Sequence, residues 1–129
     1  MKNGFTLIEL VIVLAIMAIL GAIAVPNFTE TSFKARLKAD IQSARVIDNA
    51  KDLYENETGN TLNESATEAI KTLFDNRYLK RNYTTPQTSA AVWELDGIIK
   101  VNITNCAEKV KNLYDSLSDE EKLYVKNGS

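Results

Sequence analysis

The sequence predicts an α+β fold, in which one long N-terminal helix packs by its C-terminal half on a small antiparallel β-sheet, with extra short helices after the hairpin. Three observations predict it. Apolar residues crowd into the first 25 positions, and further apolar residues recur at helical spacing up to Tyr54. Later, the segment AVWELDGIIKVNI places Asp96-Gly97 between two strand-like runs, which indicates a β-hairpin. The length of 129 residues suits one domain.

The first apolar segment has the length of a membrane helix. Phe5 to Val25 is a run of 21 residues. As an α-helix it would reach about 31 Å, close to the hydrocarbon thickness of a bilayer. Within residues 1–28 the only charged side chains are Lys2 and Glu9. The positive charge at the start predicts that the amino terminus stays cytoplasmic while the rest of the chain is sent outward.

Glu9 separates two interpretations of this segment. In the first, the segment is an ordinary secretory signal, cleaved after the small-x-small triplet Ala22-Ile23-Ala24. A carboxylate inside such a segment costs roughly 2.5–3.5 kcal/mol, which a disposable signal has no reason to carry. In the second, cleavage after Gly4 leaves an α-amino group on Phe5, one helical turn before Glu9. The carboxylate of one subunit would then pair in lipid with the amine of a neighbour and fix an axial stagger.

Residues 4–10, GFTLIEL, and the apolar run that ends in Ala24-Val25-Pro26 resemble the class III signal of type IV pilins and type II secretion pseudopilins. The resemblance implies a type IV pilin-like fold, cleavage after Gly4 by a prepilin peptidase and N-methylation of Phe5. It further implies that Glu9 guides the subunit into a helical filament whose core is the apolar helix. The implied partners are copies of the chain, other pilin-like subunits, membrane lipid before assembly, and an inner-membrane assembly platform with a cytoplasmic ATPase.

The same resemblance predicts how the chain is divided. Residues 1–4 are the leader peptide, residues 5–28 the hydrophobic transmembrane and assembly helix, and residues 29–129 the globular head, which includes the amphipathic half of the helix. The subunit is expected to be a single-pass protein of the cell membrane before assembly and part of an extracellular pilus at the cell surface afterwards. Gly21 and Pro26 supply helix flexibility, because glycine weakens a helix and proline removes a hydrogen bond. Which residues unwind is left open.

The long helix is expected to continue through Pro26, from about Phe5 to Glu57, and to end at Thr58-Gly59-Asn60. Its second half carries one apolar stripe, made of Phe33, Leu37, Ile41, Ala44, Ile47 and Tyr54. The capping-box spacing of Thr61 to Glu64 predicts a second helix that runs to about Asn76. Its inward-facing residues are expected to be Ala69, Ile70, Leu73 and Phe74.

Strand signals follow the second helix. Arg81 to Thr85 is expected to form a short edge strand that Pro86 stops. The hairpin turn at Asp96-Gly97 is expected to be of type I′, and Trp93 is expected to pack in the core rather than to bind a ligand.

The segment after the hairpin is predicted to be helical. Asn105 would cap a helix that runs through Tyr114, and Ser118 would cap a last short helix. The acidic triplet Asp119-Glu120-Glu121 favours a capped, solvated helix start over a calcium site, because no ligand loop with a turn glycine is visible. Cys106 is the single cysteine, so no internal disulfide can form, and the topology of this segment is left open.

The composition excludes several classes of function. The chain has no histidine, the commonest general base and metal ligand. No nucleophile–base pair, phosphate loop or metal cluster is visible, so no catalytic, cofactor-binding or metal-binding residue is assigned and an enzyme is not expected. The near-balance of 15 basic and 17 acidic residues gives no footprint for nucleic acid, which is not an expected partner unless the chain is a competence pilin.

Three hypotheses of function result. The first is a structural subunit of a type IV pilus or pilus-like filament. The second is a pseudopilin of a type II secretion or competence DNA-uptake system, which would share the same N-terminal signal. The third is an exported binding domain, either soluble after release by cleavage following Ala24 or still anchored in the membrane.

Overall fold

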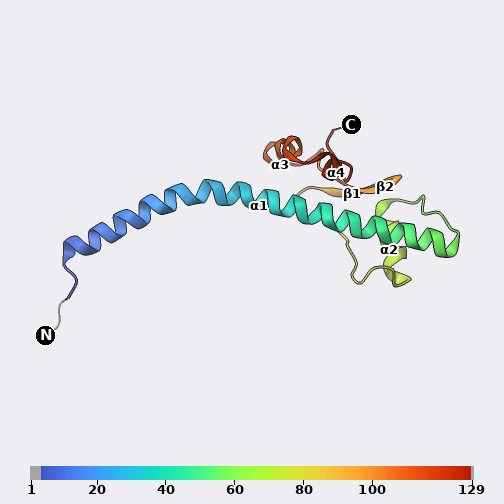
Figure 1. The fold of residues 1–129 in the computed structure, drawn as a ribbon, viewed down its shortest axis with the longest axis horizontal. Coiled ribbons are helices and arrows are strands. Elements are labelled where there is room, and N and C mark those ends of the chain that lie inside the picture. Colours follow the sequence, from blue (N-terminus) through green and yellow to red (C-terminus); the bar gives the residue numbers. More distant parts are fainter. Residues whose placement is uncertain (1–3, 129) are drawn as a thin grey trace. The chain divides into compact units, whose positions relative to one another are not determined.

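The fold combines one long helix with a small sheet and short helices, as the sequence predicts (Figure 1). The computed structural model describes residues 4–128, apart from the side chains of residues 24–29. Its elements are α1 (Leu7–Thr58), α2 (Ala66–Asp75), β1 (Val92–Asp96), β2 (Ile98–Asn102), α3 (Glu108–Leu113), a 3₁₀ turn (Tyr114–Ser116), α4 (Asp119–Lys122) and β3 (Val125–Lys126).

Residue contacts divide the chain into two units, Met1–Ser32 and Phe33–Ser129. The continuous helix expected from about Phe5 to Glu57 is confirmed, because α1 runs from Leu7 to Thr58. It ends where the sequence indicates. The Thr58 hydroxyl donates to the Tyr54 carbonyl at 2.7 Å, and Gly59 takes a φ of +75°, a left-handed conformation that closes a helix.

The second helix begins later than predicted. Ser65, and not Thr61, is the N-cap of α2, and its side chain accepts a hydrogen bond from the Glu68 N–H at 3.4 Å. Ser65 and Glu68 have the same capping-box spacing as the predicted pair, four residues further on. From this start Ala69, Ile70 and Leu73 face the core as predicted. Phe74 does not, since it is 38% exposed.

The segment between α2 and β1 is a loop, so the predicted edge strand over Arg81 to Thr85 is wrong. The loop is instead held by Asp40 of α1, which is buried. Its carboxylate accepts hydrogen bonds from the Gln87 N–H at 2.7 Å and the Thr88 N–H at 2.8 Å, as well as from the Thr88 hydroxyl. Gln87 and Thr88 follow the predicted strand, and their N–H groups find their acceptor in a side chain. Within the predicted strand itself, the Thr84 N–H donates to the Asn82 carbonyl at 3.1 Å, a local turn contact in place of strand pairing.

The hairpin forms where predicted. β1 and β2 pair antiparallel, with Trp93 opposite Val101. Gly97 alone has a positive φ at the turn, +73°, so the turn is not of type I′, which needs two such residues. The sequence does not predict the third strand. β3 pairs with β2 in parallel, with Val101 opposite Val125.

The C-terminal segment is helical as predicted, but one of the two caps differs. α3 begins at Glu108 after Ala107, which makes no side-chain capping bond, so Asn105 is not its cap. Ser118 does cap α4, and it shares a complete capping box with Glu121.

The core lies between the second half of α1, α2, the sheet and the C-terminal helices. The predicted apolar stripe of α1 supplies the fully buried Leu37, Ile41 and Ile47. Trp93 is 8% exposed, which confirms its predicted place in the core. Asp48 also faces inward from α1 and accepts a hydrogen bond from the Ile99 N–H at 3.4 Å.

Candidate functional site

The first part of α1 is the largest exposed apolar surface of the described residues. Between Phe5 and Ile23 every large apolar side chain is at least half exposed, from 50% at Val13 to 90% at Phe5. These side chains point to all sides of the helix, because they occupy nearly every position along it. An apolar surface of this extent marks a site that binds another protein or a membrane.

Polar groups are confined to the beginning of this surface. Thr6 is the residue before α1, and it forms a reciprocal capping box with Glu9. The Thr6 N–H donates to Glu9 Oε2 at 3.1 Å, and the Glu9 N–H donates to Thr6 Oγ1 at 3.2 Å. Such a cap contributes about 1 kcal/mol and also favours a carboxylate at the positive end of the helix.

The sequence interpretation missed Thr6 as a functional residue. The signal was present, because Thr-x-x-Glu directly before an apolar run is capping-box spacing. In the uncut chain the nitrogen of Phe5 belongs to a peptide bond and carries no charge. The hydrogen bond that the Glu9 carboxylate accepts comes from the Thr6 N–H. A carboxylate has about four lone-pair positions, and it therefore keeps capacity for a further donor.

The other predicted site residues lie along the same segment. Gly4 and Phe5 precede α1 and are exposed, so the backbone around the predicted cleavage point is outside the helix. Gly21 lies within α1, and a Cβ atom added at this position would have no contact within 4 Å from outside the adjoining helix backbone. Pro26 also lies within α1, although its side chain is outside the described residues.

The acidic triplet is engaged in structure rather than left open for a cation. Glu121 completes the Ser118 capping box and pairs with Lys38 at 3.4 Å, while Glu120 pairs with Arg45 at 3.4 Å. The hydrogen bond from the Ser118 N–H lowers the pKa of Glu121. Within residues 4–128 no group of acidic or cysteine side chains is arranged to hold a metal ion. The triplet therefore fastens α4 to α1.

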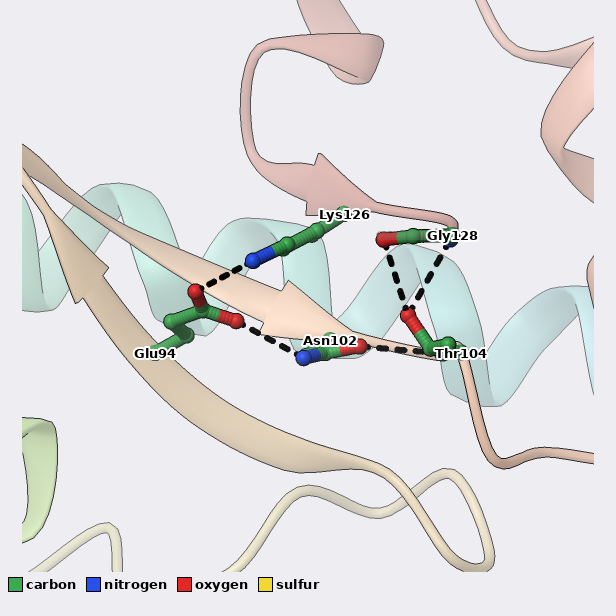
Figure 2. A network of polar contacts seen from close by, with 5 residues as sticks. All are labelled: Glu94, Asn102, Thr104, Lys126 and Gly128. Carbon is green, nitrogen blue, oxygen red and sulfur yellow. Dashed lines mark hydrogen bonds and ion pairs between the residues drawn. The ribbon is translucent and has the colours of Figure 1, made fainter.

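A polar network fastens the end of the chain to the hairpin (Figure 2). Lys126 Nζ donates to Glu94 Oε1 at 2.6 Å, and Asn102 Nδ2 donates to Glu94 Oε2 at 2.7 Å. The Thr104 hydroxyl donates to the Gly128 carbonyl at 3.2 Å and accepts from the Gly128 N–H at 3.1 Å. The bond from Lys126 lowers the pKa of Glu94. These contacts hold β3 without a disulfide.

Two further groups could suggest chemistry. A polar pocket of about 200 Å³ lies beside Asp40 and is also lined by Trp93. Both oxygens of the Asp40 carboxylate already accept hydrogen bonds from the loop described above. The Trp93 Nε1 is a buried donor without a partner in the described structure. Cys106 is buried, and this burial raises the pKa of its thiol, which opposes reactivity.

Comparison with known proteins identifies the N-terminal segment. Residues 1–25 match the prokaryotic N-terminal methylation motif. The N-terminal segment is therefore similar to that of type IV pilins and type II secretion pseudopilins. The pilin-like chain is 44% identical over 52 residues to prepilin peptidase-dependent protein A of Clostridium perfringens, and 51% identical over 53 residues to the type IV major pilin protein PilA of Myxococcus xanthus. It is 34% identical over 53 residues to the type II secretion system core protein G of Aeromonas hydrophila.

These similarities cover a limited part of each protein. The matched segments are 40%, 41% and 41% of the pilin-like chain and span 37%, 21% and 37% of the three relatives, in the order given above. No solved structure matches the chain. Pilins and pseudopilins are structural subunits, which agrees with the prediction that this chain is not an enzyme. Among the helices whose residues are described, none combines the length and the apolar character needed to cross a membrane.

Proposed function

We propose that this chain is a structural subunit of a type IV pilus or a pilus-like filament, cleaved after Gly4, N-methylated at Phe5 and polymerised through α1. The observation that carries the proposal is the apolar first part of α1, which is exposed on all sides and lies within the segment that matches the methylation motif. Residues 1–4 are the leader, residues 5–28 the assembly helix and residues 29–129 the head. Copies of the same helix, packed side by side, would cover the apolar surface that the subunit alone leaves exposed.

Glu9 has a specific role in this proposal. After cleavage, the amine of Phe5 is a new cation at the end of an apolar helix. The Glu9 carboxylate of a neighbouring subunit would neutralise it, because two unpaired charges in an apolar filament core are far costlier than one pair. The Thr6 hydrogen bond holds Glu9 at the helix end, where that amine would arrive.

The proposal includes partners that the chain itself does not contain. A prepilin peptidase would cut and methylate the subunit, and an inner-membrane platform with a cytoplasmic ATPase would assemble it together with other pilin-like subunits. Before assembly the helix of residues 5–28 would lie in the cell membrane as a single span, since lipid covers apolar side chains as well as a neighbouring helix does. The assembled filament would extend from the cell surface. Gly21 and Pro26 would let the helix adjust during this transfer.

A second candidate function is a pseudopilin of a type II secretion or competence DNA-uptake system. It is favoured by the identity of 34% over 53 residues to a secretion-system core protein. Electron microscopy with antibodies to the head separates the two candidates, because long labelled surface filaments support a pilus and their absence at normal expression supports a pseudopilin.

The mature N-terminus tests the proposal directly. Mass spectrometry of the subunit from cells is expected to find a chain that begins with N-methylated Phe5. A chain that begins at Val25 would overturn the proposal and would support an exported domain released by an ordinary signal peptidase.

Glu9→Ala is expected to leave cleavage intact and to reduce the yield of sheared filaments at least about tenfold, because one Phe5 amine per subunit interface loses its partner. Glu30→Ala is the matched control, since Glu30 is an exposed carboxylate on the same helix beyond the assembly segment. Wild-type filament yield from Glu9→Ala would contradict the charge-pair argument.

A further inference from the structure

The second half of α1 carries an uncharged stripe on the face turned away from its own core. At about 100° per residue, side chains spaced alternately four and three residues apart lie on one face of a helix. We call this face the outer seam, and it consists of Ala35, Ala39, Gln42, Val46, Asn49 and Leu53. Ala39 is half-buried and the other five are exposed. The alternating spacing is that of surfaces through which helices pack on one another.

Two large apolar side chains give the outer seam its binding potential. Val46 is 47% exposed and Leu53 is 50% exposed, and they lie two helical turns apart. Single exposed apolar residues are ordinary, but these two share one stripe without a charge between them. The core-facing residues Leu37, Ile41 and Ala44 occupy the opposite side of the helix.

Charges flank the seam in an ordered way. Arg36 lies on one flank near the beginning of the seam, and Asp52 lies on the other flank near its end. Both are exposed, and within the described part of the chain neither takes part in an ion pair. By contrast, Lys38 and Arg45 lie on the same flank as Asp52 and are already paired with α4. The seam thus has an unpaired cation near its beginning and an unpaired anion near its end.

This arrangement fits a second copy of α1 lying parallel to the first. When two parallel helices pack face to face, each flank meets the opposite flank of its neighbour. Arg36 and Asp52 are on opposite flanks and 16 residues apart. An axial displacement of about 24 Å would therefore bring Arg36 of one copy beside Asp52 of the next. Two antiparallel copies would instead bring equal flanks together and leave these charges without that match.

We infer that the later part of the outer seam, with Val46 and Leu53, docks against the earlier part of α1 of another copy of this chain, so that Asp52 of the first copy pairs with Arg36 of the other. The inference rests on the proposed function, because the filament supplies the parallel copies. In a helical filament each subunit has several neighbours, so this contact and the pairing of Phe5 with Glu9 join different copies.

Charge reversal tests the pairing in cells that assemble the full chain. Arg36→Glu alone and Asp52→Arg alone are each expected to reduce the yield of sheared filaments about tenfold, since each places like charges together. The double variant Arg36→Glu/Asp52→Arg is expected to recover to within about threefold of wild type, because the opposite pair is restored. Lys109→Glu, a reversal at an exposed lysine of α3, is the control and is expected to assemble normally. A double variant no better than the single variants overturns the inference.

A double variant and its control test the apolar contact. Val46→Lys/Leu53→Lys is expected to reduce filament yield about tenfold or more, because two charges would enter the helix contact. Leu123→Lys is the control, since Leu123 is 59% exposed elsewhere on the head. Protease resistance of the membrane-bound subunit checks folding, because solvent-facing changes should leave it as in wild type.

The outcomes distinguish a failure of this inference from a failure of the proposed function. Wild-type filament yield from Val46→Lys/Leu53→Lys overturns the inference and leaves the proposed function standing. Failure of the wild-type chain to form any filament, or a mature N-terminus other than Phe5, overturns the proposed function and this inference with it. Normal processing at Phe5 with loss of filaments only in the seam variants supports both.

Discussion

Ile12 and Ile47 are the same residue on the same helix, yet Ile12 is 53% exposed and Ile47 is fully buried. Ile12 belongs to the unit Met1–Ser32 and Ile47 to the unit Phe33–Ser129. The second unit closes a core with its own α2, sheet and C-terminal helices. In the first unit, the apolar side chains described between Phe5 and Ile23 are exposed in every direction. The comparison shows that one helix can serve two purposes, one satisfied within the chain and one that needs other molecules.

The difference is also seen in polar groups. In the second unit, Asp40 and Asp48 of α1 use their carboxylates to hold the loop before β1 and the hairpin. In the first unit, the carboxylate of Glu9 bonds only to the neighbouring Thr6 in the described structure. An acidic group whose partners are distant in sequence supports the fold, whereas Glu9, with one local partner, keeps acceptor capacity for a further donor.

The largest expected effect is the difference in unfolding free energy between variants of Ile47 and Ile12. Ile47→Ala should lower the free energy of unfolding by about 2–5 kcal/mol, because it leaves a cavity in the core. Ile12→Ala should change it by less than about 0.5 kcal/mol, because the side chain has no partner in the chain. Urea unfolding of the full chain in detergent measures both, with the fluorescence of Trp93, the single tryptophan, as the probe. Equal losses in the two variants would contradict the division into two units.

A smaller effect is expected at Asp40. Asp40→Ala should cost about 2–3 kcal/mol, because it leaves two backbone N–H groups and one hydroxyl without their acceptor. The same unfolding experiment measures the loss, and hydrogen exchange at Gln87 and Thr88 should accelerate. Asp40→Asn, which keeps one acceptor oxygen, should cost less. Unchanged exchange at both amides in the alanine variant would show that Asp40 does not hold the loop.

The smallest effect concerns pH. The hydrogen bond from Lys126 lowers the pKa of Glu94 in the folded chain, so the unfolded chain binds the proton more readily. The stability that this carboxylate contributes is present above its unfolded pKa, near 4.5, and is lost as the pH falls through the lower folded pKa. Glu94→Gln should therefore make stability depend less on pH below about pH 4.5.

Unfolding midpoints measured between about pH 3 and pH 7 test this expectation, with Glu64→Gln as the control at an exposed carboxyl. The comparison is made between variants because other groups contribute. Burial raises the pKa of Asp48, and that carboxyl acts in the opposite direction. A pH profile of Glu94→Gln that is identical to that of wild type would contradict a role for the Glu94–Lys126 pair.

The sequence was a good guide where neighbours along the chain decide the structure. The span of α1, the hairpin around Gly97 and the capping box at Ser118 all follow from spacing over a few residues. The start of α2 was misplaced because Thr61 and Ser65 both have cap spacing, and only the packing of Ala66 and Leu73 selects Ser65. The capping box of Thr6 and Glu9 is likewise a local feature, because Thr-x-x-Glu spacing directly before an apolar run predicts it.

The sequence by itself determined that the chain begins with an apolar helix bearing one carboxylate at its first turn, because residue type and helical period are local properties. Only the tertiary structure decided that Asp40 holds the loop, that α4 is fastened to Lys38 and Arg45, and that β3 joins the sheet in parallel. These contacts join residues up to 83 positions apart, as in the pair Lys38–Glu121. A distant pairing depends on which of many competing groups the whole fold brings together, and no local spacing encodes that choice.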